Sequence, residues 1–119
     1  MTNLNMSAPL MTVVDYLGYR VTALASLPIQ GPTLIYGSSD GCTTINNVSP
    51  EFSTLWGELA RTFNLKEHRV EPLHSDGVMI AGPFDIEGHL GSDGRFYVVD
   101  YARLMPPEYP TGKMYVTFT

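Results

Sequence analysis

The chain has 119 residues, of which 44% are hydrophobic, and its formal net charge at pH 7 is −5. This length fits one domain, and the apolar and aromatic content excludes a disordered chain. The negative charge gives no general attraction to phosphate backbones, so nucleic-acid binding by this domain alone is disfavoured.

We expect residues 1–10 to form a mobile leader and residues 11–119 to form one α+β domain. The leader carries no positive charge and no long apolar run, so it does not resemble a signal peptide. No stretch approaches the ~20 apolar residues that span a bilayer. Cys42 is the single cysteine, which excludes an intramolecular disulfide. We therefore expect a cytoplasmic protein that makes no membrane contact.

The first part of the domain is rich in β-forming residues. The segment 13–27 is expected to be extended, with Gly18 at a turn or bulge. A turn over 28–32 precedes a short buried strand over 33–36. A tight polar loop follows at 37–41, and a second short strand is expected over 43–45.

The clearest helix is predicted over residues 50–63. Ser49 is suited to the N-cap, Pro50 to the first helical position and Glu51 to the positive end of the helix dipole. Apolar residues recur at helical spacing and form one stripe, which predicts a face packed on the core. The stripe contains Phe52, Leu55, Trp56, Leu59, Ala60 and Phe63.

After the helix, residues 66–72 are expected to form a polar connection or a short strand. Further strands are predicted over 78–81, 84–86, 96–100 and 114–118. Asp93-Gly94 predicts a hairpin, because both residue types tolerate a positive φ. The expected fold is α+β, a mostly antiparallel sheet of about five to seven short strands covered by one main helix.

The loop from Tyr36 to Thr44 is the first of two polar groups of residues. Its members Gly37, Ser38, Ser39 and Asp40 are candidate ligand-binding residues, since exposed amides and hydroxyls can surround an anion. The sequence lacks the Gly-Lys-Ser/Thr ending of a P-loop. The alternative interpretation is a turn stabilised by its own Ser and Asp side chains.

The second polar group lies between residues 85 and 103. If Asp85 and Glu87 share one face of a strand and His89 and Asp100 approach them, the group would bind a divalent ion or a ligand. The alternative is a structural ion-pair network in which Arg95 or Arg103 neutralises an aspartate.

No complete catalytic motif accompanies these groups. Cys42 lacks an identifiable base, the three histidines lack zinc-finger spacing, and no Gly-x-Ser-x-Gly elbow occurs. The sequence therefore assigns no catalytic residue, no metal ligand and no cofactor, and it favours a non-enzymatic role.

Several stretches, in order along residues 13–108, resemble the latter part of the CLU (clustered mitochondria) domain. The most specific is the hairpin at 93–97 followed by Asp-Tyr-Ala-Arg and Pro-Pro-Glu. The resemblance implies an interaction domain and supplies no catalytic residue. The matching stretches are residues 15–20, 34–41, 63–66 and 85–108.

The leading functional hypothesis is a non-catalytic interaction domain that binds a protein partner. The alternative is a nucleotide- or magnesium-binding, phosphotransferase-like domain with its site around Asp85 and Asp100. A third hypothesis is self-association, in which the apolar final strand over 113–118 adds to the sheet edge of another chain.

Overall fold

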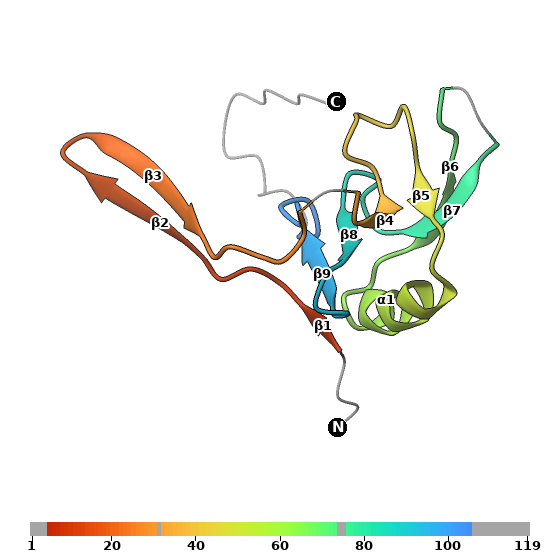
Figure 1. Ribbon diagram of the computed structural model, residues 1–119. Coiled ribbons are helices and arrows are strands. Elements are labelled where there is room, and N and C mark those ends of the chain that lie inside the picture. Colours follow the sequence, from red (N-terminus) through yellow and green to blue (C-terminus); the bar gives the residue numbers. More distant parts are fainter. Residues whose placement is uncertain (1–4, 31, 74–75, 106–119) are drawn as a thin grey trace, which may run out of the picture.

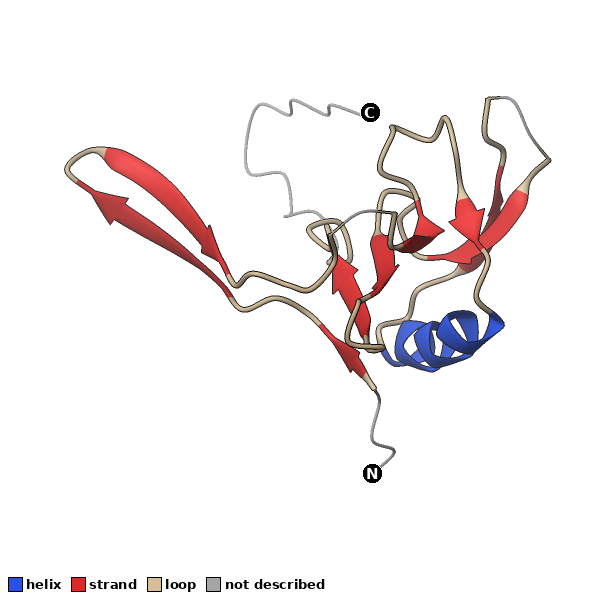
Figure 2. Ribbon diagram, in the orientation of Figure 1, coloured by secondary structure: helices blue, strands red, loops and turns tan. Residues whose placement is uncertain are grey.

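The computed structural model describes residues 5–30, 32–73 and 76–105. These residues form one helix and nine strands, arranged as a body of sheet and helix from which one hairpin extends (Figures 1 and 2). The strands are β1 (Met6–Ser7), β2 (Met11–Tyr16), β3 (Tyr19–Leu24), β4 (Leu34–Gly37), β5 (Asn46–Asn47), β6 (Glu67–Val70), β7 (Val78–Ala81), β8 (Glu87–Leu90) and β9 (Phe96–Val99), and the helix is α1 (Pro50–Thr62).

The main sheet has five strands in the order β1-β9-β8-β4-β5. Strand β1 pairs with β9 in parallel, and the other pairs are antiparallel. The pairing of β1 makes Met6 and Ser7, two residues of the expected leader, part of the edge strand of this sheet. The hairpin predicted at Asp93-Gly94 is confirmed: Gly94 has φ 76° and joins β8 to β9.

Helix α1 begins where the sequence predicts. The Ser49 side chain accepts a hydrogen bond from the Phe52 backbone N–H at 3.2 Å, so it is the N-cap, and Pro50 occupies the first turn. Phe52, Trp56 and Ala60 of the apolar stripe are buried in the core. The helix ends at Thr62, one residue before the predicted end.

An aromatic cluster joins α1 to the main sheet. The Phe52 ring lies 5.2 Å from the Tyr36 ring and 5.5 Å from the Phe96 ring, between centroids, and meets Phe96 edge-on. Gly88 is required beneath it, because a Cβ there would lie 2.3 Å from the Phe52 ring. These contacts fix the helix against β4, β8 and β9.

Two two-stranded ribbons complete the fold. Strands β6 and β7 pair antiparallel beside α1, and β2 and β3 form the separate hairpin. In Figure 1 the β2–β3 hairpin points away from the body. The α+β class with mostly antiparallel pairing is confirmed, although the strands divide among three sheets.

Two of the predicted strands are wrong. Residues 43–45 belong to a turn, because the Thr44 backbone N–H is bound by the Asp40 carboxylate at 2.9 Å, and the strand β5 follows at Asn46. Residues 84–86 form a turn after Pro83, to whose carbonyl the Ile86 N–H donates, and β8 follows at Glu87. The strand predicted over 114–118, with the segment 113–118 of the self-association hypothesis, lies outside the described residues.

No helix among the described residues is long and apolar enough to cross a membrane.

Candidate functional site

The β2–β3 hairpin, which we call the arm, is exposed along its whole length. Every residue from 10 to 26 is exposed. Nine of the fifteen exposed large hydrophobic residues in the described chain lie between Leu10 and Leu24. Such a concentration of uncovered apolar side chains is typical of an interaction surface.

The register of the arm sorts its side chains into two faces. Directly paired residues of an antiparallel ribbon share a face, and successive residues alternate between faces. We call the apolar one the tyrosine face; it contains the pairs Thr12–Ala23, Val14–Val21 and Tyr16–Tyr19. The opposite, mixed face contains Met11–Leu24, Val13–Thr22 and Asp15–Arg20.

Charge is confined to the mixed face. Arg20 donates two hydrogen bonds to the Asp15 carboxylate, at 2.7 and 3.0 Å. This ion pair lowers the pKa of Asp15 and raises that of Arg20. Both side chains are well exposed, so the ion pair adds little to stability. The residues of the tyrosine face carry no charge.

The tip of the arm combines an unfavourable backbone with an exposed leucine. Leu17 and Gly18 have φ values of 48° and 81°, as a two-residue type I′ turn requires. Asn or Gly is preferred at the first of these positions, and a larger side chain there costs about 1–2 kcal/mol. Leu17 is 79% exposed, so no packing within the described residues offsets this cost.

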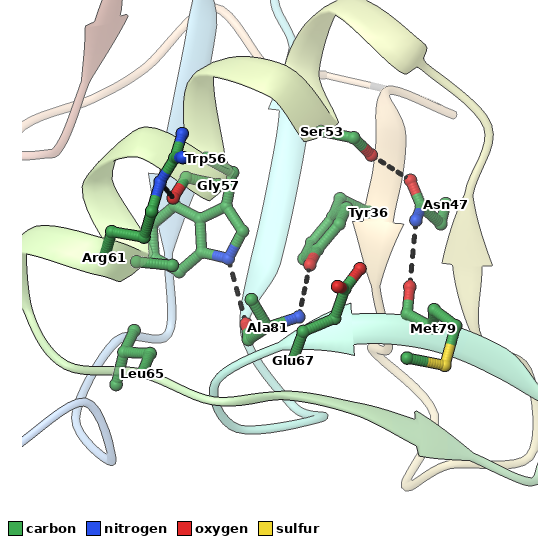
Figure 3. A pocket seen from close by; sticks show the side chains of 11 residues that line it. Tyr36, Asn47, Ser53, Trp56, Gly57, Arg61, Leu65, Glu67, Met79 and Ala81 are labelled. Atoms are coloured by element: carbon green, nitrogen blue, oxygen red, sulfur yellow. Dashed lines mark hydrogen bonds between the residues drawn. The ribbon is translucent and has the colours of Figure 1, made fainter.

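A separate pocket of about 330 Å³ lies in the body, between α1 and the β6–β7 ribbon (Figure 3). Its buried floor is formed by Tyr36, Trp56 and Ala81. The charged side chains that line it are Arg61 and Glu67. Asn47, Ser53, Gly57, Ala60, Leu65 and Met79 complete the lining.

The loop that follows β4 uses its polar groups internally. The buried Ser38 hydroxyl donates to Asp40 at 2.9 Å and accepts from the Cys42 N–H at 3.0 Å. The hydrogen bond from the Thr44 backbone N–H is the main reason that the pKa of Asp40 lies below its usual value. These hydrogen bonds have the geometry of a turn stabilised by its own Ser and Asp side chains, the alternative to a ligand-binding loop. Gly37 has φ 79°, and Ser39 is exposed.

The second group of polar residues divides into two pairs. Arg103 forms an ion pair with one carboxylate oxygen of Asp85, and the other oxygen is buried and has no hydrogen-bond partner among residues 5–30, 32–73 and 76–105. His89 is buried; its Nε2 lies 3.1 Å from Glu87 and its Nδ1 lies 3.0 Å from the Thr33 hydroxyl. The expected shared face for Asp85 and Glu87 is wrong, because Asp85 lies in the turn before β8.

The remaining candidates of this group are exposed. Arg95 lies beside the β8–β9 turn, and Asp100 follows β9 with φ 56°. Within residues 5–30, 32–73 and 76–105, no three His, Cys, Asp or Glu side chains gather closely enough to hold a metal ion.

The sequence interpretation missed both the tyrosine face and the pocket. The apolar residues of the arm predict strands, but the same residue types occur in buried strands such as β9. The pocket joins residues of α1 and β6 that no short motif connects. One sequence signal does point to the arm: a leucine, Leu17, occupies the turn, where a polar residue is usual, and a tyrosine stands on each side of the turn.

Comparison with known proteins identifies relatives of the chain. A sequence model of the family described as Clustered mitochondria (CLU) matches residues 1–110. Clustered mitochondria protein homologs from Xenopus tropicalis and Homo sapiens are each 34% identical over 102 residues. Protein clueless from Drosophila persimilis is 31% identical over 102 residues.

These alignments cover 81% of the chain but only 7–8% of each relative's length. The similarity therefore concerns one small region of much longer proteins. No solved structure matches the chain.

Proposed function

Because this chain belongs to the clustered mitochondria (CLU) family, we propose that it is a non-catalytic binding domain that docks a protein partner on the tyrosine face of its arm. The observation that carries this proposal is the complete exposure of residues 10–26, although the segment is rich in large apolar side chains.

The energetics of the arm favour a docking role. An isolated two-stranded hairpin is marginally stable in water, and this one pairs with no other strand in the described chain. Exposed apolar side chains on it gain nothing from the body of the domain. A partner that covered them would gain roughly 25 cal/mol for each Å² of apolar surface removed from water.

The tip supports the same conclusion. An exposed leucine in a conformation that suits Asn or Gly adds no stability to the free domain. Unfavourable backbone conformations persist more often where a binding role requires the side chain. We therefore include Leu17 in the docking surface.

The chemistry of the surface selects a protein partner. The tyrosine face is apolar and uncharged, and the chain carries a net charge of −5, so a nucleic acid finds no basic surface on the arm. Tyrosines are enriched in protein interfaces, because each buries a large area and keeps a polar tip. We further propose that binding takes place in the reducing cytoplasm, which suits a chain with the single cysteine Cys42.

Valine-to-threonine substitutions on the two faces test this function. Val14→Thr with Val21→Thr makes the tyrosine face polar while retaining β-branched residues that favour strands. Val13→Thr alone is the control on the mixed face. Each protein would be immobilised, and proteins captured from a cell lysate would be quantified against the wild-type set.

We expect the double variant to lose a defined captured protein that the wild type and the control retain. Equal capture by all three would refute the arm as the docking surface. Light scattering of each purified chain distinguishes a second copy from another protein, because self-association through this face would disappear only in the double variant.

A further inference from the structure

The pocket between α1 and the β6–β7 ribbon has the features of a small-molecule site. Its volume of about 330 Å³ lies at the lower end of the range for ligand pockets. It is lined by residues of the body and is separate from the arm. An inference about its ligand therefore does not depend on the proposed docking function.

The floor of the pocket presents one hydrogen-bond donor (Figure 3). The Trp56 indole N–H donates to the Ala81 carbonyl at 2.9 Å, and the Ala81 N–H donates to the Tyr36 hydroxyl oxygen at 2.8 Å. Within the described residues, the hydrogen of the Tyr36 hydroxyl has no acceptor. Burial, with a smaller contribution from the charge of Glu67, raises the pKa of Tyr36, so the hydroxyl remains a donor.

The wall formed by β6 supplies a negative charge. Glu67 pairs with Ala81 in the ribbon, so both side chains lie on the face that lines the pocket. No salt bridge to Glu67 occurs among the described residues. Its carboxylate is therefore available to a cation that enters the pocket.

The opposite wall, formed by the last turn of α1, supplies a positive charge. The Arg61 Nε donates to the Gly57 carbonyl at 3.3 Å, which leaves the two terminal nitrogens of the guanidinium for other acceptors. No salt bridge joins Arg61 to Glu67 in the described part of the chain. The pocket thus presents opposite charges on separate elements.

We propose that this pocket binds a protonated amine that carries a carbonyl or carboxylate oxygen beside it, the chemistry of a free α-amino acid or of the amino terminus of a peptide. Glu67 binds the ammonium group, and Arg61 and the Tyr36 hydroxyl donate to the oxygen. An α-amino group with a pKa near 8 is mostly protonated at neutral pH. A purely anionic ligand would face Glu67 and the negative net charge, whereas a bare cation would face Arg61.

Trp56 allows direct observation of binding, because it is the only tryptophan of the chain and lines the pocket. The intact protein would be titrated with each free α-amino acid while its intrinsic fluorescence is followed. Amino-acid amides, which keep the ammonium and a carbonyl, and N-acetyl amino acids, which lack the ammonium, would be titrated in parallel. The variants are Glu67→Gln and the control Glu58→Gln, which removes the same charge from α1 at a residue that does not line the pocket.

A saturable millimolar-range signal with free amino acids is expected, at least tenfold weaker in Glu67→Gln and unchanged in Glu58→Gln. Equal binding of the amides would identify a peptide amino terminus as the source, and weaker binding of the amides would identify the free amino acid. No saturable signal from the folded wild type, equal binding of N-acetyl amino acids, or unchanged binding in Glu67→Gln would each overturn the proposal.

Discussion

The β8–β9 hairpin and the arm are built from similar residues, but one is buried and the other is exposed. In β8–β9, the turn at Asp93-Gly94 brings Phe96, Tyr97 and Val98 into a buried sheet. In the arm, the turn at Leu17-Gly18 joins strands of valine and tyrosine that remain exposed. The comparison teaches that local sequence determines a hairpin, whereas burial depends on which other elements reach it.

The largest expected difference between body and arm concerns aromatic truncation. Phe52→Ala removes a ring that is 1% exposed at the centre of the aromatic cluster, and should cost about 3–5 kcal/mol. Tyr19→Ala on the arm removes a ring that is 75% exposed, and should cost less than about 1 kcal/mol. Chemical denaturation of both variants measures the two costs. Equal costs would mean that the arm is packed in solution.

A methyl group added to the body should be the next largest effect. Gly88→Ala places a Cβ 2.3 Å from the Phe52 ring and 2.8 Å from the Tyr36 Cβ, and should destabilise the protein by about 1–3 kcal/mol. Gly57→Ala is the matched control, because a Cβ at this helical position meets no atom within 4 Å. It should stabilise the protein by about 0.5–1 kcal/mol. Shifts of the thermal unfolding temperature in opposite directions, down for Gly88→Ala and up for Gly57→Ala, would support the described packing.

A change at the tip of the arm should be smaller and local. Leu17→Asn places a residue that tolerates positive φ at the first turn position, and should stabilise the hairpin by about 1 kcal/mol. Hydrogen exchange of the arm amides should slow by a corresponding factor, with no change in β8 or β9. Faster exchange in the variant would show that Leu17 packs against something in the free protein.

The smallest expected effect is the pH-dependent contribution of the Asp15–Arg20 ion pair to the stability of the arm. The hydrogen bonds from Arg20 hold the pKa of Asp15 below its ordinary value of 3.8. A depressed folded pKa stabilises the hairpin above the ordinary value, and this contribution is lost as the pH falls through the folded value. The carboxyl carbon of Asp15, followed by NMR, should titrate below 3.8 and return towards it in Arg20→Gln. An unchanged midpoint in the variant would argue against the pair.

Much of the fold was predictable because its signals are local. Ser49, Pro50 and the apolar stripe determine α1 within one segment, and Asp93-Gly94 determines the β8–β9 turn. The strand predicted over 43–45 was wrong because a side chain four residues away, Asp40, takes the Thr44 N–H. Competition of this kind depends on turn geometry, which composition does not specify.

The candidate sites were harder to predict because they depend on contacts that are absent or distant. Tyr16 and Tyr19 are exposed in a separate two-stranded ribbon, whereas Tyr97 is buried on β9, which lies between β1 and β8 in the main sheet. Glu67 and Arg61 come to line the same pocket only after β6 has paired with β7 beside α1. Neither the exposure of the arm nor the pairing of β6 beside α1 can be derived from local sequence patterns, and these patterns instead favour the polar loops as candidate sites.

The central claim is that the tyrosine face of the arm docks a protein partner, and photo-crosslinking from the two faces tests it most directly. A photoreactive phenylalanine would replace Tyr19 on the tyrosine face or Thr22 on the mixed face. Irradiation in cells should give an adduct of defined mass from position 19 and little from position 22. Equal adducts from both positions, or none from position 19, would contradict the claim.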